Sequence, residues 1–255
     1  MELVDTHCHL DLEAFNPDRS EVLARARARG VRRMLVPAVD AAHWDGLLQL
    51  CRMDEALYPA LGLHPVFLGE HTAADVLALE GAVEEHRPVA VGEIGLDYLV
   101  PGLDRAQQQA LFEAQLETAR AAGLPVILHV RKAHDQTIST LKRIPVSGGT
   151  VHAFNGSLQQ AQRYLDMGFR LGFGGTLTYP RSTRIRKLAA ALPLDAIVLE
   201  TDAPDMVVAA HQGERNSPEY LPDCLQALAE VRDAAPDELA LQTTRNARDV
   251  FALDA

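Results

Sequence analysis

Short apolar runs alternate with longer stretches whose apolar residues recur at helical spacing. Eight such runs occur in order, at Leu3–Asp5, Arg33–Val36, Tyr58–Leu61, Val89–Gly92, Val126–Leu128, Thr150–Val151, Phe169–Phe173 and Ala196–Leu199. This alternation is typical of parallel strands joined by crossover helices. About eight strands over about 250 residues is the usual size of a closed barrel. We therefore predict an α/β fold of the (β/α)8 TIM-barrel class. An open doubly wound sheet is the alternative, but no GxGxxG follows the first run to favour its dinucleotide-binding form.

Local signals place the ends of several helices. Asp104 is a good N-cap, and Gln107 stands where a capping-box partner belongs, so a helix is predicted to begin here. Gly123 ends this helix and Pro125 opens the next strand. The last stretch, Glu219–Phe251, is predicted to form two helices. One of these is an extra C-terminal helix that packs on the outside of the barrel.

Composition is that of an ordinary globular protein. The 255 residues are 47% hydrophobic and 23% charged, and we expect one domain over residues 1–255. The N-terminus lacks the pattern of a secretory signal, and no apolar run is long enough to span a membrane. The three cysteines form no CxxC pair and are expected to be reduced. These features predict a cytoplasmic protein without a membrane association, and they indicate no obligate protein partner.

The net charge of −11 bears on possible nucleic-acid partners. Proteins that coat duplex DNA usually carry a basic patch, so the charge argues against that role. It does not exclude a nuclease, because bound metal ions would invert the field locally.

Potential metal ligands follow most of the apolar runs. The first run leads into His7 and His9, and later runs lead into Glu93, His129, His152 and Asp202. Active-site residues of a barrel lie at the carboxyl ends of its strands, so these side chains are expected to meet. Side chains alternate along an extended chain, so His7 and His9 point the same way while Cys8 points away. Four imidazoles and two carboxylates are a reasonable donor set for two divalent cations. Each residue alone is commonly structural, and the evidence is the constellation.

Other polar residues are candidates on weaker grounds. His64 follows the third run, and it either contacts the substrate or structures its loop. Arg131 lies two residues after His129 and shares its face, so it can pair with a phosphate or be an ordinary surface arginine. Asp5 and Glu200 share a face with proposed ligands by alternation, which predicts that each accepts an N–H from a ligand imidazole unless the alternation is broken. Asp97 is open to either role.

The chain resembles the TatD-type metal-dependent deoxyribonucleases, which are amidohydrolase-like barrel hydrolases. The resemblance rests on seven motifs in the family's order, VDTHCHL, GLHP, VGEIGLDY, LPVILHVRKA, HAFNGS, GFGGTLT and VLETDAPDM. It extends from Asp5 to the closing TTRNARDVF. The segment from ETDAPDM to RNSPEYLP is more similar to a less characterised branch than to the best-known nuclease.

The resemblance implies a ligand set and a reaction. His7, His9 and Asp202 would hold one metal, Glu93 would bridge, and His129 and His152 would hold the second. It also implies that Asn216 lies in a loop near the site. The ions would be Zn²⁺, Mg²⁺ or Mn²⁺.

The implied activity is deoxyribonuclease activity of the exonuclease type on single-stranded DNA or DNA ends, with Asp202 orienting or deprotonating the attacking water. Two alternatives remain. The same donors suit hydrolysis of a small amide, lactone or phosphoester, and a scaffold protein could retain the fold. No GxSxG elbow favours a metal-free nucleophile.

Overall fold

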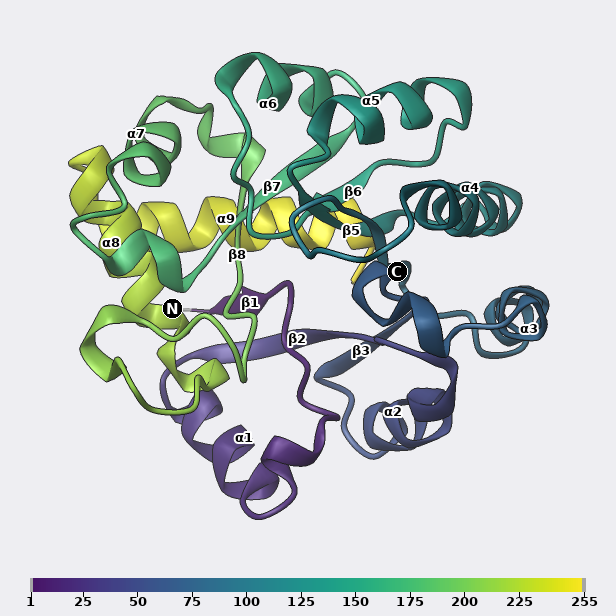
Figure 1. Ribbon diagram of the computed structural model, residues 1–255. Helices are drawn as coiled ribbons and strands as arrows, with labels where there is room; N and C mark the ends of the chain where they lie inside the picture. Colours follow the sequence, from purple (N-terminus) through teal and green to yellow (C-terminus); the bar gives the residue numbers. More distant parts are fainter. Residues whose placement is uncertain (1, 254–255) are drawn as a thin grey trace.

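The eight predicted runs form eight parallel strands that follow one another in chain order around one sheet (Figure 1). The computed structural model describes residues 2–253. Its strands are β1 Leu3–Asp5, β2 Val31–Pro37, β3 Leu57–Leu61, β4 Ala90–Asp97, β5 Val126–Arg131, β6 Gly149–Val151, β7 Phe169–Phe173 and β8 Ile197–Leu199. Parallel pairing in chain order requires a crossover between each pair of neighbours, and helices supply most of each crossover.

The last strand returns to the first and closes the ring. Thr6 N–H donates to the Leu199 carbonyl at 3.0 Å, just beyond β1. Further along, Asp202 N–H donates to the His7 carbonyl at 2.8 Å, and Cys8 forms a parallel bridge with Ala203. The sheet is therefore a closed (β/α)8 TIM barrel, as predicted.

The helices form a ring outside the strands (Figure 1). They are α1 Arg19–Ala28, α2 Trp44–Arg52, α3 Ala73–His86, α4 Arg105–Ala122, α5 His134–Arg143, α6 Leu158–Leu165, α7 Thr183–Ala191 and α8 Leu221–Arg232, followed by α9 Pro236–Phe251. The predicted N-cap and the predicted end of α4 are confirmed, but the structure shows no capping box with Gln107. The Asp104 side chain accepts from the Gln107 N–H, and Gly123 takes a left-handed conformation at φ 69°, where glycine avoids the clash of a Cβ atom.

From the sequence we expected the extra helix α9 to pack on the outside of the barrel. It packs instead across one end of the barrel. Its residues Ala247 and Phe251 join the apolar cluster formed by inward-facing strand residues, including Val4 of β1 and Ile127 of β5. Asn246 of α9 donates to the Ile197 carbonyl at the start of β8. The helix thus covers the amino-terminal end of the barrel, and the carboxyl end is left for chemistry.

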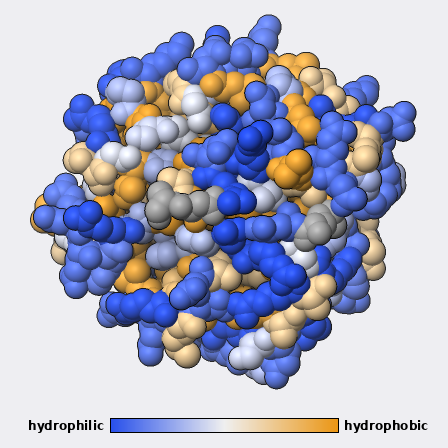
Figure 2. Space-filling model, turned by 180° about the vertical axis from the view of Figure 1, so that it is seen from behind, coloured by the Kyte–Doolittle hydropathy of each residue, from blue (hydrophilic) through white to orange (hydrophobic). Residues whose placement is uncertain are grey.

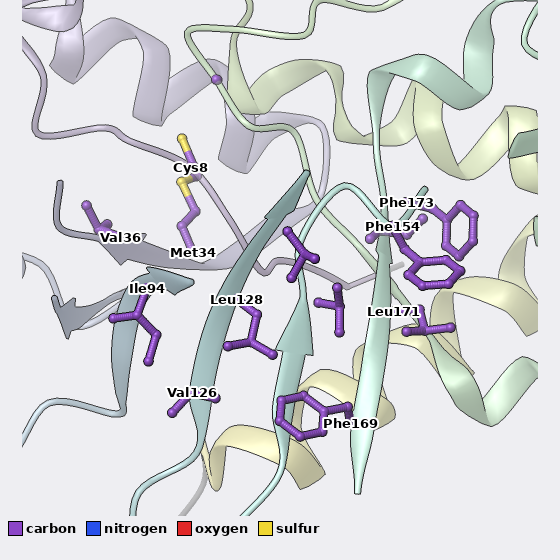
Figure 3. Close-up of a cluster of buried hydrophobic side chains, with 14 of the residues drawn as sticks. Cys8, Met34, Val36, Ile94, Val126, Leu128, Phe154, Phe169, Leu171 and Phe173 are labelled. Atoms are coloured by element: carbon purple, nitrogen blue, oxygen red, sulfur yellow. The ribbon is translucent and has the colours of Figure 1, made fainter. Parts of the chain in front are cut away.

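Alternate strand residues divide between the barrel interior and the shell of helices. Along β5, Ile127 belongs to the interior cluster, whereas Val126 and Leu128 belong to a larger cluster beneath the helices. Figure 3 shows part of this larger cluster, including Cys8. The thiol of Cys8 is buried on the side away from the barrel interior, as alternation predicts, and burial raises its pKa well above the usual value.

The opposite face of the molecule from that seen in Figure 1 is mostly hydrophilic, with hydrophobic residues scattered among polar ones (Figure 2). Among residues 2–253, no helix combines the length and the apolar character that crossing a membrane requires.

Candidate metal centre

The six predicted ligands converge at the carboxyl end of the barrel. Five of them line a cavity of about 660 Å³, namely His9, Glu93, His129, His152 and Asp202. The sixth, His7, is completely buried beneath these residues. The structure thus brings together donors from five strands that are far apart in the sequence.

Three of the donors meet at the seam between β8 and β1. His7 Nε2 lies 3.1 Å from His9 Nε2 and 3.7 Å from Asp202 Oδ1, and His9 Nε2 lies 3.6 Å from that oxygen. Ligands in a tetrahedral site with bonds of about 2.1 Å are about 3.4 Å apart. His9 Nδ1 donates to the Pro37 carbonyl at 3.0 Å, so its Nε2 is the ring nitrogen that faces the other donors. The spacing and the donor chemistry both fit a divalent cation.

Glu93 lies between this group and the donors of the next strands. Its Oε2 is 3.0 Å from His7 Nε2, and its Oε1 is 3.0 Å from His129 Nδ1. A carboxylate whose two oxygens face different imidazoles has the geometry of a bridging ligand. His152 stacks on His7 at 3.8 Å between ring centroids, and its Nε2 is 3.4 Å from Asp202 Oδ2. His152 therefore stands nearer the seam than the resemblance implied.

An irregularity in β4 places Glu93 in the interior. The pairing of β4 with β5 shifts register between Val91 and Ile94, and both of these residues face the helices. Gly92 and Glu93 occupy the extra length, and a Cβ atom at Gly92 would lie 2.7 Å from Ile127 Cβ. Bulges commonly re-aim a side chain in this way. The strand then continues to Asp97, so Glu93 lies within β4 rather than after it.

Buried carboxylates contact the imidazoles from behind. Asp97 Oδ2 accepts from His129 Nε2 at 2.9 Å, which leaves Nδ1 of that ring towards Glu93. Glu200 Oε1 lies 3.1 Å from His152 Nδ1 and accepts from the Ala153 N–H at 2.6 Å. Carboxylates in such positions fix the orientation of a ligand ring and raise its basicity. Glu200 thus lies where alternation along β8 placed it.

Asp5 differs from its predicted position. It accepts from the Thr201 N–H at 2.9 Å, from the Thr201 hydroxyl at 2.6 Å and from the His7 backbone N–H at 3.2 Å. None of these donors is a ligand imidazole. The chain bends at Thr6, so alternation is broken between Val4 and His7 and Asp5 no longer shares the face of the ligands. The broken alternation that we left open is the correct interpretation.

Charges in the site favour ionised carboxylates. Burial by itself raises the pKa of Asp202, but positive charge on His152, His7 and His9 outweighs burial and lowers it to about 2. Burial likewise opposes ionisation of Glu93, and the charges of His7 and His64 hold its pKa well below the usual value. Both groups are therefore anionic and suited to bind cations.

His64 and Arg131 both line the cavity. His64 Nε2 lies 3.1 Å from His129 Nδ1 and 3.4 Å from Glu93 Oε1, so His64 contacts two of the candidate ligands. Its Nδ1 also accepts from the Val66 N–H, which begins a short 3-10 helix. Arg131 is half-exposed, and its guanidinium lies 3.8 Å from Asp97 Oδ2. The guanidinium thus stands at the cavity wall with donors to spare.

Asn216 has a different role from the predicted substrate contact. It is completely buried and is not part of the cavity wall. Its amide group donates to the carbonyls of Thr201 at 2.8 Å and Asp205 at 2.6 Å, and its Oδ1 accepts from the Ser217 N–H. Both ends of its side-chain amide are engaged within the protein. Asn216 therefore clamps the loop that carries Asp202.

Asp205 and Phe67 are among the cavity-wall residues that sequence reasoning missed. Asp205 lies three positions after Asp202 in the same loop, and Phe67 follows His64 by three. The side chain of Phe67 is 37% exposed and packs edge-on against the His64 ring. Neither residue has ligand-like spacing. Their proximity in sequence to predicted site residues was the signal that could have found them.

The chain matches one protein family over nearly its whole length. Residues 4–252 match the family described as TatD related DNase. The chain is 42% identical over 252 residues to the uncharacterized metal-dependent hydrolase YjjV of Escherichia coli K12, with 97% of each protein covered. The crystal structure of YjjV, a TatD homolog from the same organism, matches with a TM-score of 0.95 over 98% of both chains. A protein of Klebsiella pneumoniae named 3'-5' ssDNA/RNA exonuclease TatD is 33% identical, with 99% of this chain and 98% of that protein covered.

These matches span nearly the whole chain. The barrel and its cluster of candidate ligands follow from the structure itself, without the matches. The chain is accordingly a metal-dependent hydrolase that belongs to the family of TatD related DNases.

Proposed function

We propose that this protein is a phosphodiesterase that uses two divalent cations to hydrolyse DNA as an exonuclease acting on single strands or ends. The single observation that carries the proposal is the convergence of five donors around a sixth, Glu93, whose two oxygens face different imidazoles at 3.0 Å. The relative named as a 3'-5' ssDNA/RNA exonuclease supports nucleic acid as the substrate class. The proposed compartment is the cytoplasm, where three unpaired cysteines would stay reduced.

The donors divide into two groups around Glu93. His7, His9 and Asp202 would hold one cation at the seam, and Glu93 and His129 would hold the other. His152, next to both Glu93 and Asp202, would contribute from between them. When bound, the cations would supply neutralisation of the phosphate charge and a lowered pKa of water.

Protein side chains would position and deprotonate the reactants. Arg131 reaches the cavity with unpaired guanidinium donors, so it would hold a non-bridging phosphate oxygen through paired hydrogen bonds. An Asp202 oxygen would accept the proton of the attacking water, since this carboxylate is ionised and lines the cavity. Glu200 and Asp97 would keep the rings of His152 and His129 in place.

One observation favours the second candidate, a binuclear hydrolase of a small phosphoester, amide or lactone. Among the described residues, Arg131 is the single arginine or lysine in the cavity wall, and Phe67, Val66 and Leu12 make part of that wall apolar. A polynucleotide groove usually has more cations, whereas small-ligand cavities are mainly apolar with a few polar groups.

The two candidates are separated by a substrate panel. The purified protein, loaded in turn with Zn²⁺, Mg²⁺ or Mn²⁺, is given single-stranded DNA labelled at either end and a set of small phosphoesters, amides and lactones. We expect stepwise shortening of the DNA from one end. Rapid turnover of a lactone or amide, with intact DNA under every metal, would overturn the proposal.

A further inference from the structure

Asp205 is a charged group of the cavity wall that the candidate metal centre does not use. It is exposed and lines the cavity beside Asp202. Its side chain makes no hydrogen bond or ion pair with another residue of the described part of the chain, 2–253. A free carboxylate here is unexpected, because a cavity that binds phosphate gains nothing from a further negative charge.

The backbone holds this carboxylate in a defined place. Asp205 N–H donates to the Asp202 carbonyl at 2.8 Å, and the Asp205 carbonyl accepts from the buried amide of Asn216 at 2.6 Å. These bonds fix the loop on the β8 side of the cavity. The backbone of Asp205 is thus held in place by hydrogen bonds, while its side chain can bind a ligand.

The two charged wall residues outside the candidate ligands stand on different sides. Arg131 follows His129 on β5, and Asp205 follows Asp202 after β8. Apolar side chains such as Val39, Ile185 and Met206 complete the wall. A ligand that lies across the site would present an anion towards Arg131 and would need a hydrogen-bond donor, or at least no negative charge, towards Asp205.

We propose that Asp205 determines specificity by admitting phosphodiesters that present a hydroxyl next to the scissile group and by excluding those that present a second phosphate. This inference rests on the proposed phosphodiesterase activity. The sugar hydroxyl at the end of a DNA strand can donate to the carboxylate, whereas a terminal phosphate is repelled by it. The residue thereby selects hydroxyl-ended over phosphate-ended nucleotides.

The test uses two nucleotides that differ in one group. They are thymidine 5'-(p-nitrophenyl phosphate) and the same compound with a 3'-phosphate, and kcat/KM is measured for the metal-loaded protein. The wild type is expected to prefer the hydroxyl form by about tenfold or more, since opposed like charges in a recognition site cost several kcal/mol. Asp205→Asn keeps the shape but removes the charge, so it should raise kcat/KM for the phosphate form and narrow the preference.

Glu214→Gln is the matched control, because it removes one negative charge from an exposed residue of the same loop that does not line the cavity. It should keep the wild-type preference, and metal content should be equal in all three proteins. A wild type without preference, or an Asp205→Asn variant that keeps it, would overturn the inference.

If neither compound is hydrolysed, the proposed phosphodiesterase activity is contradicted, but the inference about Asp205 still needs its own test. Thermal shifts with thymidine 5'-monophosphate and thymidine 3',5'-bisphosphate then decide the inference by binding alone. The wild type must bind the monophosphate more tightly, and Asp205→Asn must lose that difference. Equal binding by the wild type, or an unchanged difference in the variant, overturns it.

Discussion

In the proposed mechanism, Asp202 is both a metal ligand and the proton acceptor. It adopts a left-handed backbone conformation with φ 59°, which aspartate and asparagine tolerate better than most residues. We predict that Asp202→Asn keeps the fold and weakens metal binding without abolishing it, because the amide still offers an oxygen. Turnover should fall by roughly 10²–10⁴-fold, as is typical for loss of a general base. Activity within a few-fold of wild type at saturating metal would limit Asp202 to a ligand role.

His152→Ala should behave differently from Asp202→Asn. The substitution deletes a nitrogen that lies 3.4 Å from Asp202 Oδ2 and leaves buried Glu200 without its imidazole neighbour. We expect the protein to lose at least one bound ion together with its activity. Elemental analysis of the purified variant, beside its turnover, measures both. Full metal content in an inactive His152→Ala protein would contradict a ligand role.

Substitution of Gly172, which is not a candidate ligand, tests whether Glu200 holds His152 in place. A Cβ atom at this position would lie 2.1 Å from Glu200 Oε2, so Gly172→Ala must displace that carboxylate. We predict a loss of about 1–3 kcal/mol in unfolding free energy and metal affinity lower by about 10–100-fold. Chemical denaturation and metal titration measure the two effects.

Gly81→Ala is the matched control for this substitution. Gly81 lies in α3, and a Cβ atom added there meets nothing within 4 Å. The substitution should stabilise the protein by about 0.5–1 kcal/mol and leave metal affinity unchanged. If the two variants have the same metal affinity, Glu200 does not support the site.

At the scale of the elements, the strands and most of the candidate site could be predicted from the sequence, because functional residues of a barrel lie at the carboxyl ends of its strands. Donors after apolar runs meet at one end, and this was enough to assemble the ligands from His7 to Asp202. Alternation failed where the backbone departs from regular pairing. The bend at Thr6 turned Asp5 away from the ligands, and the register shift before Ile94 turned Glu93 towards them. Such local irregularities leave no periodic signal in a sequence.

Loop residues were harder to predict than strand residues for a related reason. The position of Asp205 depends on Asn216, eleven residues further along, whose amide holds the Asp205 carbonyl. Asn216 itself was expected to contact substrate, because a polar residue in a site loop looks the same in sequence whether it faces the cavity or the protein. Only the folded chain shows which of its groups are already engaged.

At the scale of the whole molecule, one end of the barrel serves stability and the other serves chemistry. Phe251 of α9 is buried among the inward-facing residues of the strands at the amino-terminal end. We predict that Phe251→Ala lowers the free energy of unfolding by about 3–5 kcal/mol, as for other buried aromatic residues. Metal affinity at the opposite end should be unchanged. Denaturation and metal titration of the same preparation check this separation, and a parallel loss of metal would contradict it.

Removal of the metal should affect both activity and heat resistance. Exhaustive chelation is predicted to abolish hydrolysis, and Mn²⁺, Mg²⁺ or Zn²⁺ should restore it. An ion that binds only the folded state adds stability by mass action, so the melting temperature should rise on reloading. Full activity in a preparation with zero metal content would refute the dependence.

The seam between β8 and β1 joins the last strand and the first strand in one candidate ligand group. Asp202 N–H bonds to the His7 carbonyl, and the side chains of the same two residues face a common point. A growing chain therefore has no complete ligand group at the seam until the loop after β8 has been made. An ion can therefore bind at the seam only after β8 has paired with β1, and the bound ion would stabilise that pairing. When the metal is removed, amide hydrogen exchange should accelerate first at Thr6 and Asp202.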